Sequence, residues 1–575
     1  MPPPKNRVVL GLNAYSHDAG VALVVDGRLV FAAEEERYDR VKHSAAFPRQ
    51  AIAAALAFAG VGTSDIDRVA FCWRKDMARL RKALYVLGRL PFSLPFLTER
   101  PDGLPPRLSY LRSIARLPHD LAGAGIAAPV AYVEHHFAHA VQAHRFGPAD
   151  EAAIVTADGM GEWTATATWR AGREGLARVA ERTYPQSLGK VYAAVTQHLG
   201  FRPDADEGKT MGLAPYGRPA LVGAFREIVR PDPLSLYRID LTAFDYPRGR
   251  TTMAGVPFAR RFGPAREPEG PLESCHEDLA HAAQTVLEEA LLEVARTLAR
   301  RSAPQGGEGG HLGLAGGLFL NCALNGRLAR EAGFDSLFVF PAAGDAGAAA
   351  GAAAWVAGME RTELKDALLG DAFDSQAIGA ALEGRPARTV ADAPAAAARA
   401  IADGKVVGWF QGRMEFGPRA LGARSILADP RDPEIKDRLN RTVKFREAFR
   451  PFAPAVLEEA APEWFLSPRP SPFMLLVFPV RPERRATIPG VVHVDGTARV
   501  QTVAQGAGPF RRLIEAFAAR TGVPVVLNTS LNVRGEPIVR TPQEALTCFD
   551  RSGIDVLVMG DRLLEKRGPR GPETP

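Results

Sequence analysis

Residues 8–36 read VVLGLNAYSHDAGVALVVDGRLVFAAEEE, and this stretch decides the fold of the N-terminal part of the chain. Short apolar runs stop at polar turn residues, and the Asp26-Gly27 pair is typical of a β-hairpin turn. The stretch therefore predicts a strand, a polar turn, a second strand, a tight hairpin and a third strand. An acidic residue, Asp18, lies in the first turn.

The same plan returns in residues 152–181, AAIVTADGMGEWTATATWRAGREGLARVAE, with Asp158 in the first turn. Each of the two units is followed by Ala- and Leu-rich sequence that is typical of helices. Two such units predict a duplicated α/β domain. We expect the paired turns to face one cleft, which in such a domain is a usual nucleotide site.

Two later glycine-rich turns extend this prediction. GGHLGLAGGLFLNCALNGRLAR (309–330) and FVFPAAGDAGAAAGAAAW (338–355) both read as a strand, a turn and a helix, and Asp345 lies in the second turn. Backbone N–H groups in such turns can approach a phosphate or a nucleoside. Close helix packing explains either turn alone equally well.

The chain has 575 residues, more than one hydrophobic core usually serves, so we expect at least two domains. Sequence that is Ala-rich, poor in aromatics and interrupted by Gly and Pro marks the boundary, which we place at residue 385. The predicted domains are therefore 1–385 and 386–575, both α/β. A basic segment, 74–107, is either an insertion that flanks a substrate entrance or a solvated amphipathic helix with a loop.

Composition and charge exclude several classes of protein. The chain is 46% hydrophobic and 24% charged, as soluble globular proteins are. Its net charge of +6 arises without a dense Lys/Arg block, so we expect no nucleic-acid partner. Its four cysteines are far apart and form no C-x-x-C pair. The apolar runs are too short for a signal peptide or a membrane span, so we expect a cytoplasmic protein with no membrane partner.

The segment AYVEHHFAHAVQAH (131–144) holds four of the twelve histidines. On a helix, His135 and His139 project from one face, where both can bind one ion. For this spacing alone, structural histidines are an equal alternative. A carboxylate from a facing turn would complete a site of two histidines and one or two carboxylates, which suits iron(II) or another divalent metal. Asp158 and Asp345 are the candidate carboxylates.

The pair His17-Asp18 lies in the first turn of the opening stretch. A neutral imidazole there could take a proton from a hydroxyl as the hydroxyl attacks an electrophile. The alternative is that His17 only bonds to the backbone of the turn. We predict His17 and Asp18 as catalytic residues.

Basic and apolar residues alternate in GRMEFGPRALGARSILADPR (412–431) and NRTVKFREAFRPFAP (440–454). Several guanidinium groups should therefore be held against an apolar wall, which is costly unless an anion binds. Arginine forks match phosphate oxygens, so the set predicts a pocket for a phosphorylated small molecule and a nucleotide. Salt bridges with nearby acids are an alternative for any one arginine. The predicted contacts are Arg413, Arg419, Arg424, Lys444, Arg446, Arg450, Asn528 and Ser530.

With these residues in place, the chain resembles the O-carbamoyltransferase family, which includes nodulation carbamoyltransferases and enzymes that carbamoylate antibiotics. The resemblance runs nearly end to end. It rests on SHDAGVALVVDG, EEERYDRVKHSAAFP, EHHFAHA, ADGMGEW, DEGKTMGLAPYG, AGGLFLNCALNGR, GDAGAA, GRMEFGPRALGARSILADPR, KFREAFRPFAPAV and LNTSLNVRGEPIV. Leu531 and Ala423 depart from the phenylalanine and asparagine that are common in the family, which bears on local packing only.

The resemblance implies the fold class. It implies an α/β chain with a duplicated actin/sugar-kinase-like N-terminal domain, similar to the tRNA threonylcarbamoyl transferase subunit. A carbamoyl-adenylate-forming α/β domain follows. With the resemblance, we assign the N-terminal nucleotide contacts to Gly159, Gly161, Gly189, Lys190, Gly316, Gly317 and Asn321.

The resemblance also implies an ATP-dependent O-carbamoyltransferase. Carbamoyl phosphate and ATP with Mg²⁺ would form carbamoyl-adenylate and pyrophosphate in the C-terminal domain. Passage through a closed interior would keep water away from this labile intermediate. In the N-terminal domain, Fe²⁺ held by the two histidines and two aspartates would polarise it, and His17 would act as base on a hydroxyl of a small natural product or sugar. The implied C-terminal contacts are Arg419, Lys444, Arg450, Arg499, Asn528 and Ser530.

Three alternatives stay open. A hydrogenase-maturation carbamoyltransferase shares both domains, but its family also carries paired C-x-x-C motifs and an acylphosphatase domain, and the chain shows neither. A tRNA threonylcarbamoylation enzyme normally splits the two domains between proteins. An actin-like ATPase scaffold would need the glycine-rich turns but neither the His135/His139 pair nor the arginine set. A homodimer is common in such folds, and the sequence leaves the oligomeric state open.

Overall fold

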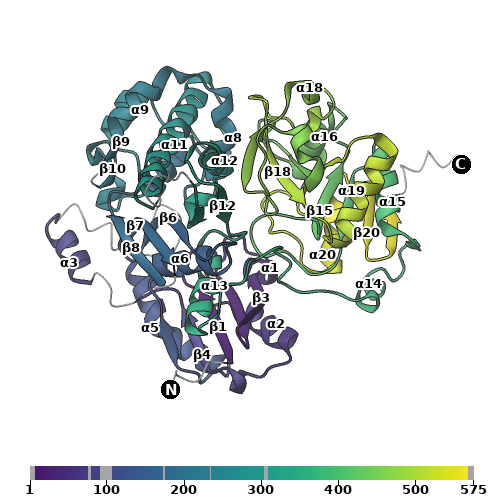
Figure 1. Ribbon diagram of the computed structural model, residues 1–575, viewed down its shortest axis with the longest axis horizontal. Helices are drawn as coiled ribbons and strands as arrows, with labels where there is room; N and C mark the ends of the chain where they lie inside the picture. Colours follow the sequence, from purple (N-terminus) through teal and green to yellow (C-terminus); the bar gives the residue numbers. More distant parts are fainter. Residues whose placement is uncertain are drawn as a thin grey trace, which may run out of the picture. The chain divides into compact units, whose positions relative to one another are not determined.

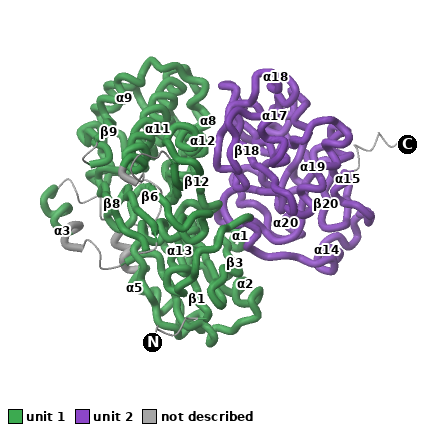
Figure 2. Tube along the Cα trace, viewed as in Figure 1, with its two compact units in different colours: residues 1–39, 43–365 green, residues 40–42, 366–575 purple. Residues whose placement is uncertain are grey.

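The computed structural model describes residues 7–74, 79–90, 107–172, 175–232, 235–302 and 309–566. The chain divides into two compact units, drawn in Figure 1 and coloured separately in Figure 2. Unit 1 comprises residues 1–39 and 43–365, and unit 2 comprises residues 40–42 and 366–575. Part of the predicted entrance segment, residues 75–78 and 91–106, lies outside the described residues.

The predicted domain boundary at residue 385 falls inside unit 2, between α14 (Ser375–Ala381) and β13 (Arg388–Thr389). The residues just after 365 bond to unit 2 through the backbone. The Gly370 N–H donates to the Met414 carbonyl at 2.9 Å, and the Met414 N–H donates to the Asp371 carbonyl at 2.7 Å. These bonds tie the segment to unit 2 well before the Ala-rich stretch ends.

In the described part of unit 1, two five-stranded sheets share one strand order and one set of strand directions. In each sheet the first three strands run antiparallel and the other two continue in parallel. The first sheet has the order β3-β2-β1-β4-β5: β1 (Val8–Asn13), β2 (Gly20–Val25), β3 (Arg28–Glu34), β4 (Arg68–Phe71) and β5 (Val130–Tyr132). The second has the order β12-β11-β6-β7-β8: β6 (Ala152–Gly161), β7 (Thr164–Gly172), β8 (Gly175–Thr183), β11 (His311–Ala315) and β12 (Ser336–Val339). The two predicted three-strand stretches are thus confirmed as the antiparallel halves of the two sheets.

Helix α13 (Asp345–Val356) packs closely against β1 and against α6 (His135–Arg145). The sequence of α13, DAGAAAGAAAWV, consists mostly of alanine and glycine, and these small residues allow the close approach. A Cβ on Gly11 of β1 would lie 2.1 Å from the Ala349 carbonyl oxygen, and a Cβ on Gly351 would lie 2.0 Å from the Ala138 carbonyl oxygen. Only glycine allows these backbones to approach so closely. This packing fixes the start of α13 relative to α6.

The other helices of unit 1 surround the two sheets (Figure 1). The longest described helix, α11, packs against α7, α9 and α12. In the described part of the chain, no helix combines the length and the apolar character that crossing a membrane requires. The helices are α1 (Glu36–Asp39), α2 (Arg49–Ala59), α3 (Arg79–Leu87), α5 (Arg107–Gly123), α7 (Leu188–His198), α8 (Glu207–Leu213), α9 (Val222–Ile228), α10 (Val256–Phe262), α11 (Ser274–Ser302) and α12 (Cys322–Glu331), beside a ribbon of β9 (Val229–Asp232) and β10 (Leu236–Ile239).

The described part of unit 2 is built on one nine-stranded mixed sheet, of order β13-β21-β20-β14-β15-β19-β16-β18-β17. The pairs β14-β20 and β16-β18 are parallel, and the other neighbours are antiparallel. Its further strands are β14 (Val407–Phe410), β15 (Arg424–Ala428), β16 (Ala453–Leu457), β17 (Leu476–Pro479), β18 (Thr497–Val503), β19 (Val525–Ser530), β20 (Val556–Met559) and β21 (Arg562–Glu565). The helices besides α14 are α15 (Ala393–Ala402), α16 (Ile435–Leu439), α17 (Ala461–Trp464), α18 (Pro482–Arg485), α19 (Gly508–Thr521) and α20 (Pro542–Arg551). The predicted arginine-rich segments lie at the strands in the middle of this sheet.

Candidate functional site

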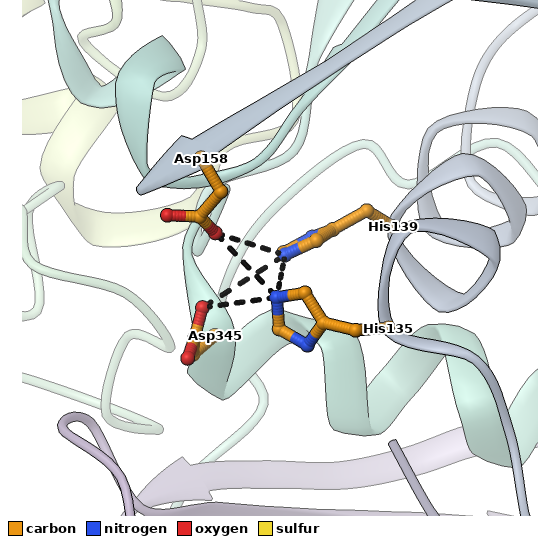
Figure 3. Close-up of side chains that lie close together, drawn as sticks. All are labelled: His135, His139, Asp158 and Asp345. Carbon is orange, nitrogen blue, oxygen red and sulfur yellow. Dashed lines mark hydrogen bonds and ion pairs between the residues drawn. The ribbon is translucent and has the colours of Figure 1, made fainter. Parts of the chain in front are cut away.

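Two histidines and two aspartates of unit 1 meet in one buried group, the His/Asp cluster of His135, His139, Asp158 and Asp345 (Figure 3). The two Nε2 atoms of the histidines are 3.1 Å apart. Asp158 Oδ2 lies 3.5 Å from both nitrogens. Asp345 Oδ1 lies 3.4 Å from His135 Nε2 and 3.9 Å from His139 Nε2. The structure thus brings together all four predicted metal ligands.

Three elements supply the side chains of the cluster. His135 and His139 lie on successive turns of α6, as the i, i+4 spacing predicts, and both are fully buried. Asp345 is the first residue of α13. Asp158 lies in β6, where the pairing with β7 shifts register between Ala157 and Gly161. Such an irregularity re-aims a side chain, here toward the histidines.

Hydrogen bonds fix the tautomers of both histidines. His139 Nδ1 lies 3.1 Å from Gln142 Oε1, and Gln142 Nε2 donates to the Ala342 carbonyl, so His139 Nδ1 carries the proton. His135 Nδ1 donates to the Cys72 carbonyl at 3.3 Å. Both Nε2 lone pairs therefore face each other and two carboxylates. These lone pairs and the carboxylate charges repel one another unless a cation lies among them. The set fits a divalent metal whose imidazole ligands are held in place by hydrogen bonds at Nδ1.

The electrostatics of the cluster agree with this fit. Burial opposes a charge on His135, but the carboxylates of Asp345 and Asp158 outweigh burial and raise the pKa of the imidazole well above its usual value. Burial likewise opposes the charge on Asp158, yet His135 and His139 hold the pKa of its carboxyl well below the usual value. The two carboxylates therefore favour positive charge at the centre, as a bound cation would supply.

The ring of His135 is tightly enclosed. The indole of Trp73 stacks on it, with 4.0 Å between ring centroids, and Trp73 Nε1 donates to Asn13 Oδ1 at 2.9 Å. A Cβ on Gly161 would lie 2.3 Å from His135 Cδ2. Gly161, which we predicted as a nucleotide contact, therefore makes room for a metal-ligand candidate. Trp73 was not among the predicted site residues.

His17 lies beside the cluster and is held by Asp18. His17 Nδ1 is 3.0 Å from Asp18 Oδ2, and His17 Nε2 is 4.0 Å from Asp345 Oδ2. Burial opposes a charge on His17, but Asp345 and Asp18 outweigh it and raise the pKa of His17 to about 10. With no cation on Asp345, this imidazole is protonated at neutral pH. The two predicted catalytic residues thus adjoin each other and the cluster.

Asp18 holds a second imidazole, that of His43. Asp18 Oδ1 lies 2.8 Å from His43 Nδ1, and the two histidines keep the pKa of Asp18 well below its usual value against the effect of burial. Asp18 and His43 have φ values of 58° and 57°, a region that residues other than glycine rarely adopt. His43 was not among the predicted site residues. Its position in EEERYDRVKHSAAFP is the signal that could have found it.

Three of the predicted nucleotide-contact glycines lie around Asp158. A Cβ on Gly189 would lie 2.8 Å from the Asp158 carbonyl oxygen. Gly316 has a φ of 105°, and its Cβ would lie 2.2 Å from the carbonyl oxygen of Ala157. The Gly317 N–H donates to Asp158 Oδ2 at 3.4 Å. These glycines let two chain segments approach the backbone around Asp158 closely.

The other predicted nucleotide contacts of unit 1 form two groups. Lys190 pairs with Asp204 at 2.8 Å, and a Cβ on Gly159 would lie 3.2 Å from Lys190 Cε. Asn321 caps α12 and exchanges hydrogen bonds with the side chain of Gln284. Lys190 therefore lies near the turn after Asp158, whereas the Asn321 side chain is already engaged in the fold.

Unit 2 gathers cations at the centre of its sheet. Lys444 is buried, and its Nζ donates to Ser530 Oγ at 3.2 Å and to Asn532 Oδ1 at 2.8 Å. Burial and the charge of Arg446 lower the pKa of Lys444 well below its usual value. Burial and the charges of Arg450 and Arg499 do the same to the pKa of Arg446. We call Lys444, Arg446, Arg450 and Arg499 the cation cluster.

The cation cluster has the character of an anion site. Four like charges repel one another, and desolvation adds to the cost. Arg499 Nε is buried and, within the described part of the chain, has no hydrogen-bond partner. Phosphate oxygens would satisfy such guanidinium groups and would neutralise the charge of the Lys444 ammonium, which Ser530 and Asn532 already hold in place. The structure thus brings together four of the cations that we predicted around phosphates.

Two predicted phosphate contacts instead hold the backbone. Arg424 is fully buried, and its guanidinium donates to the carbonyl oxygens of Gln411 at 2.8 Å and Gly412 at 3.1 Å. Arg413 donates to the Gly370 carbonyl oxygen at 3.1 Å. Sequence alone could not separate these arginines from the others, because the difference lies in where the carbonyl groups point. We leave both out of the proposal below.

Comparison with known sequences decides the family. Residues 8–354 match the carbamoyltransferase N-terminus family, and residues 398–566 match the carbamoyltransferase C-terminus family. The chain belongs to the O-carbamoyltransferase family. The two matched regions of this carbamoyltransferase hold the His/Asp cluster and the cation cluster, respectively.

The chain is similar to the following three proteins. It is 37% identical to the nodulation protein NolNO of Sinorhizobium fredii, over 96% of this chain and 80% of the relative. It is 38% identical to an uncharacterized protein of Synechocystis sp., over 97% and 96%. It is 36% identical to a 3'-hydroxymethylcephem-O-carbamoyltransferase of Amycolatopsis lactamdurans, over 48% and 53%. The name of the last of these relatives, together with the two family matches, indicates a transferase.

Proposed function

We propose that this protein is an ATP-dependent O-carbamoyltransferase that acts on a hydroxyl of a small natural product or sugar. Family membership and one structural observation support this function: a single chain carries a partly buried cation cluster suited to phosphates and a separate His/Asp cluster suited to a divalent metal. The duplicated sheets of unit 1 agree with an actin/sugar-kinase-like domain. Each cluster would serve one half of the reaction.

The first half-reaction belongs to unit 2. Carbamoyl phosphate, ATP and water would give carbamoyl-adenylate, pyrophosphate and phosphate. Water would first cleave carbamoyl phosphate between the carbamoyl group and the phosphate, giving carbamate and phosphate. A carbamate oxygen would then attack the α-phosphorus of ATP, and pyrophosphate would leave with its electron pair. The cation cluster, together with Arg419 and the Mg²⁺ that accompanies ATP, would neutralise the phosphate oxygens as charge develops on them. Lys444 is suited to this role because Ser530 and Asn532 hold its ammonium in place.

The second half-reaction belongs to unit 1. The acceptor hydroxyl oxygen attacks the carbamoyl carbon, AMP leaves, and His17 takes the hydroxyl proton. A divalent cation such as Fe²⁺, held by the His/Asp cluster, would supply Lewis-acid polarisation when bound. A cation bound to Asp345 would also offset the charge of this carboxylate, which raises the pKa of His17. The pKa of His17 would then fall, and the neutral imidazole could act as a base. Asp18 keeps the ring oriented. Lys190 and the glycine turns around Asp158 would hold the adenylate.

The test is the release of pyrophosphate from ATP by the full chain, without any acceptor. We expect release that depends on carbamoyl phosphate, and hydroxyurea as a product when hydroxylamine is present to trap the activated carbamoyl group. Conversion of ATP to ADP and phosphate at a rate indifferent to carbamoyl phosphate would contradict the proposal. Mass spectrometry of hydroxyl compounds after the same incubation then identifies the acceptor.

A further inference from the structure

Two buried amide side chains meet on the sheet of unit 2. Asn528 lies on β19 and Gln501 on β18, and Asn528 Nδ2 donates to Gln501 Oε1 at 2.8 Å. Strand β16 lies between them, and the residues opposite the two amides are Ala453 and Ala455. Alanine is small enough to let the amides reach each other across the intervening strand. Gln501 was not among the predicted site residues.

Backbone carbonyls fix the orientation of both amides. Gln501 Nε2 donates to the Leu421 carbonyl at 2.9 Å, and this bond turns Gln501 Oε1 toward Asn528. Asn528 Nδ2 donates to that oxygen and to the Ala420 carbonyl at 3.2 Å. A carbonyl oxygen only accepts hydrogen bonds, so a flipped amide would place oxygen against oxygen. Gln501 and the Ala420 carbonyl together determine that Asn528 presents its amide oxygen, not its amide nitrogen, away from this network, and Gln501 accepts the shorter bond.

The presented oxygen is unsatisfied. Asn528 Oδ1 is buried, and none of the described residues donates a hydrogen bond to it. A buried acceptor in this state is costly unless a ligand supplies a donor. Arg499, two residues before Gln501, and Ser530, two residues after Asn528, share the face of their strands. The oxygen therefore belongs to the same face of the sheet as the cation cluster and its partner Ser530.

We propose that Gln501 is a positioning residue that makes Asn528 an acceptor for the amide N–H of a carbamoyl group. Through Asn528, Gln501 would thereby select carbamoyl over acetyl donors. A carbamoyl group offers N–H donors where an acetyl group has a methyl. A site built to pair with an N–H rejects an analogue that lacks it, because the buried acceptor is then left unpaired. The inference rests on the proposed function and names the residue that sets donor choice in unit 2.

The experiment compares carbamoyl phosphate and acetyl phosphate as donors for pyrophosphate release from ATP, as a ratio of kcat/KM. Gln501→Leu should lower the preference for carbamoyl phosphate about tenfold, because Asn528 Nδ2 then keeps only the longer of the two bonds that hold its orientation, the one to the Ala420 carbonyl. The KM for ATP should not change. Gln501→Glu with its carboxyl group protonated should keep the preference, since one carboxyl oxygen accepts from Asn528 Nδ2 and the protonated oxygen donates to the Leu421 carbonyl. The control Gln543→Leu, at an exposed position of α20, should match the wild type.

The ratio compares two donors on one preparation, so a lower folded fraction in a variant cancels. If the wild type releases pyrophosphate with carbamoyl phosphate and Gln501→Leu retains the wild-type ratio, this inference is overturned while the proposed function stands. If the wild type releases no pyrophosphate with carbamoyl phosphate, the proposed function fails and the inference fails with it.

Discussion

Replacing Gly161 with alanine should disable the His/Asp cluster while leaving the chain folded. A Cβ at this position lies 2.3 Å from His135 Cδ2, whereas carbon atoms in contact are normally about 3.5–4.0 Å apart. The imidazole must therefore move by more than about 1 Å. Trp73, stacked on the ring at 4.0 Å, limits where the imidazole can go.

The size of the effect follows from this displacement. Ligand distances in a metal site tolerate changes of about 0.2 Å, so His135 would leave the coordination sphere. Changes outside the ligand set alone cost about 10–100-fold in affinity, and the loss of a ligand should cost at least about 100-fold. The overpacking itself should lower the free energy of unfolding by about 1–3 kcal/mol, which a chain of this size survives.

The assay is calorimetric titration of metal-free protein with Fe²⁺ under anaerobic conditions, or with Mn²⁺, alongside thermal unfolding. The control is Gly208→Ala in α8, where a Cβ meets no described atom within 4 Å. This control should bind metal as the wild type does and should be slightly more stable, because alanine favours a helix. Wild-type metal affinity in the Gly161→Ala protein would refute the argument that this glycine makes room for a ligand.

Three other predictions concern single side chains. His17→Ala should stop carbamoyl transfer and leave pyrophosphate release largely intact; a variant that still transfers normally would remove His17 from the role of base. Lys444→Met should stop both, because it takes a buried ammonium from the cation cluster; unchanged pyrophosphate release would place adenylate formation elsewhere. Burial raises the pKa of Glu162 from 4.5 to about 7, so the folded protein holds this proton more tightly than the unfolded chain. The protonated Glu162 carboxyl group therefore contributes to the free energy of unfolding. This contribution is fully present below about pH 4.5 and is lost as the pH rises through about 7, which lowers the free energy of unfolding by about 3 kcal/mol. The free energy of unfolding of metal-free Glu162→Gln, measured with denaturant between pH 5 and 8, should lack this decline. If it falls with pH as steeply as that of the wild type, Glu162 does not cause the decline.

Much of the fold of unit 1 could be predicted from local patterns. Alternation of apolar runs and turn dipeptides located the three-strand stretches, because turn chemistry and strand periodicity are local properties. The i, i+4 spacing placed His135 and His139 on one helical face. The two carboxylates come from the acidic residues that we predicted in turns, although Asp158 lies in β6 and Asp345 begins α13. These are properties of residues that are close in the sequence or that begin an element.

Other features depend on contacts between distant segments. The end of unit 1 lies near Lys365 because backbone bonds tie Gly370 to Met414, which no composition shift reveals. Arg424 looks like its neighbours in the sequence, but its guanidinium binds carbonyl groups. The role inferred for Gln501 depends on a carbonyl 80 residues away. Such directions of hydrogen bonds exist only once the chain is folded.

We assign the two half-reactions to the two units of one chain. The most direct measurement is the exchange of labelled pyrophosphate into ATP, without acceptor, by the wild type, Lys444→Met and His139→Ala. Carbamoyl phosphate should be required for exchange, Lys444→Met should abolish exchange, and His139→Ala should preserve it while losing transfer. Equal loss of exchange in both variants, or no exchange by the wild type, would contradict the account.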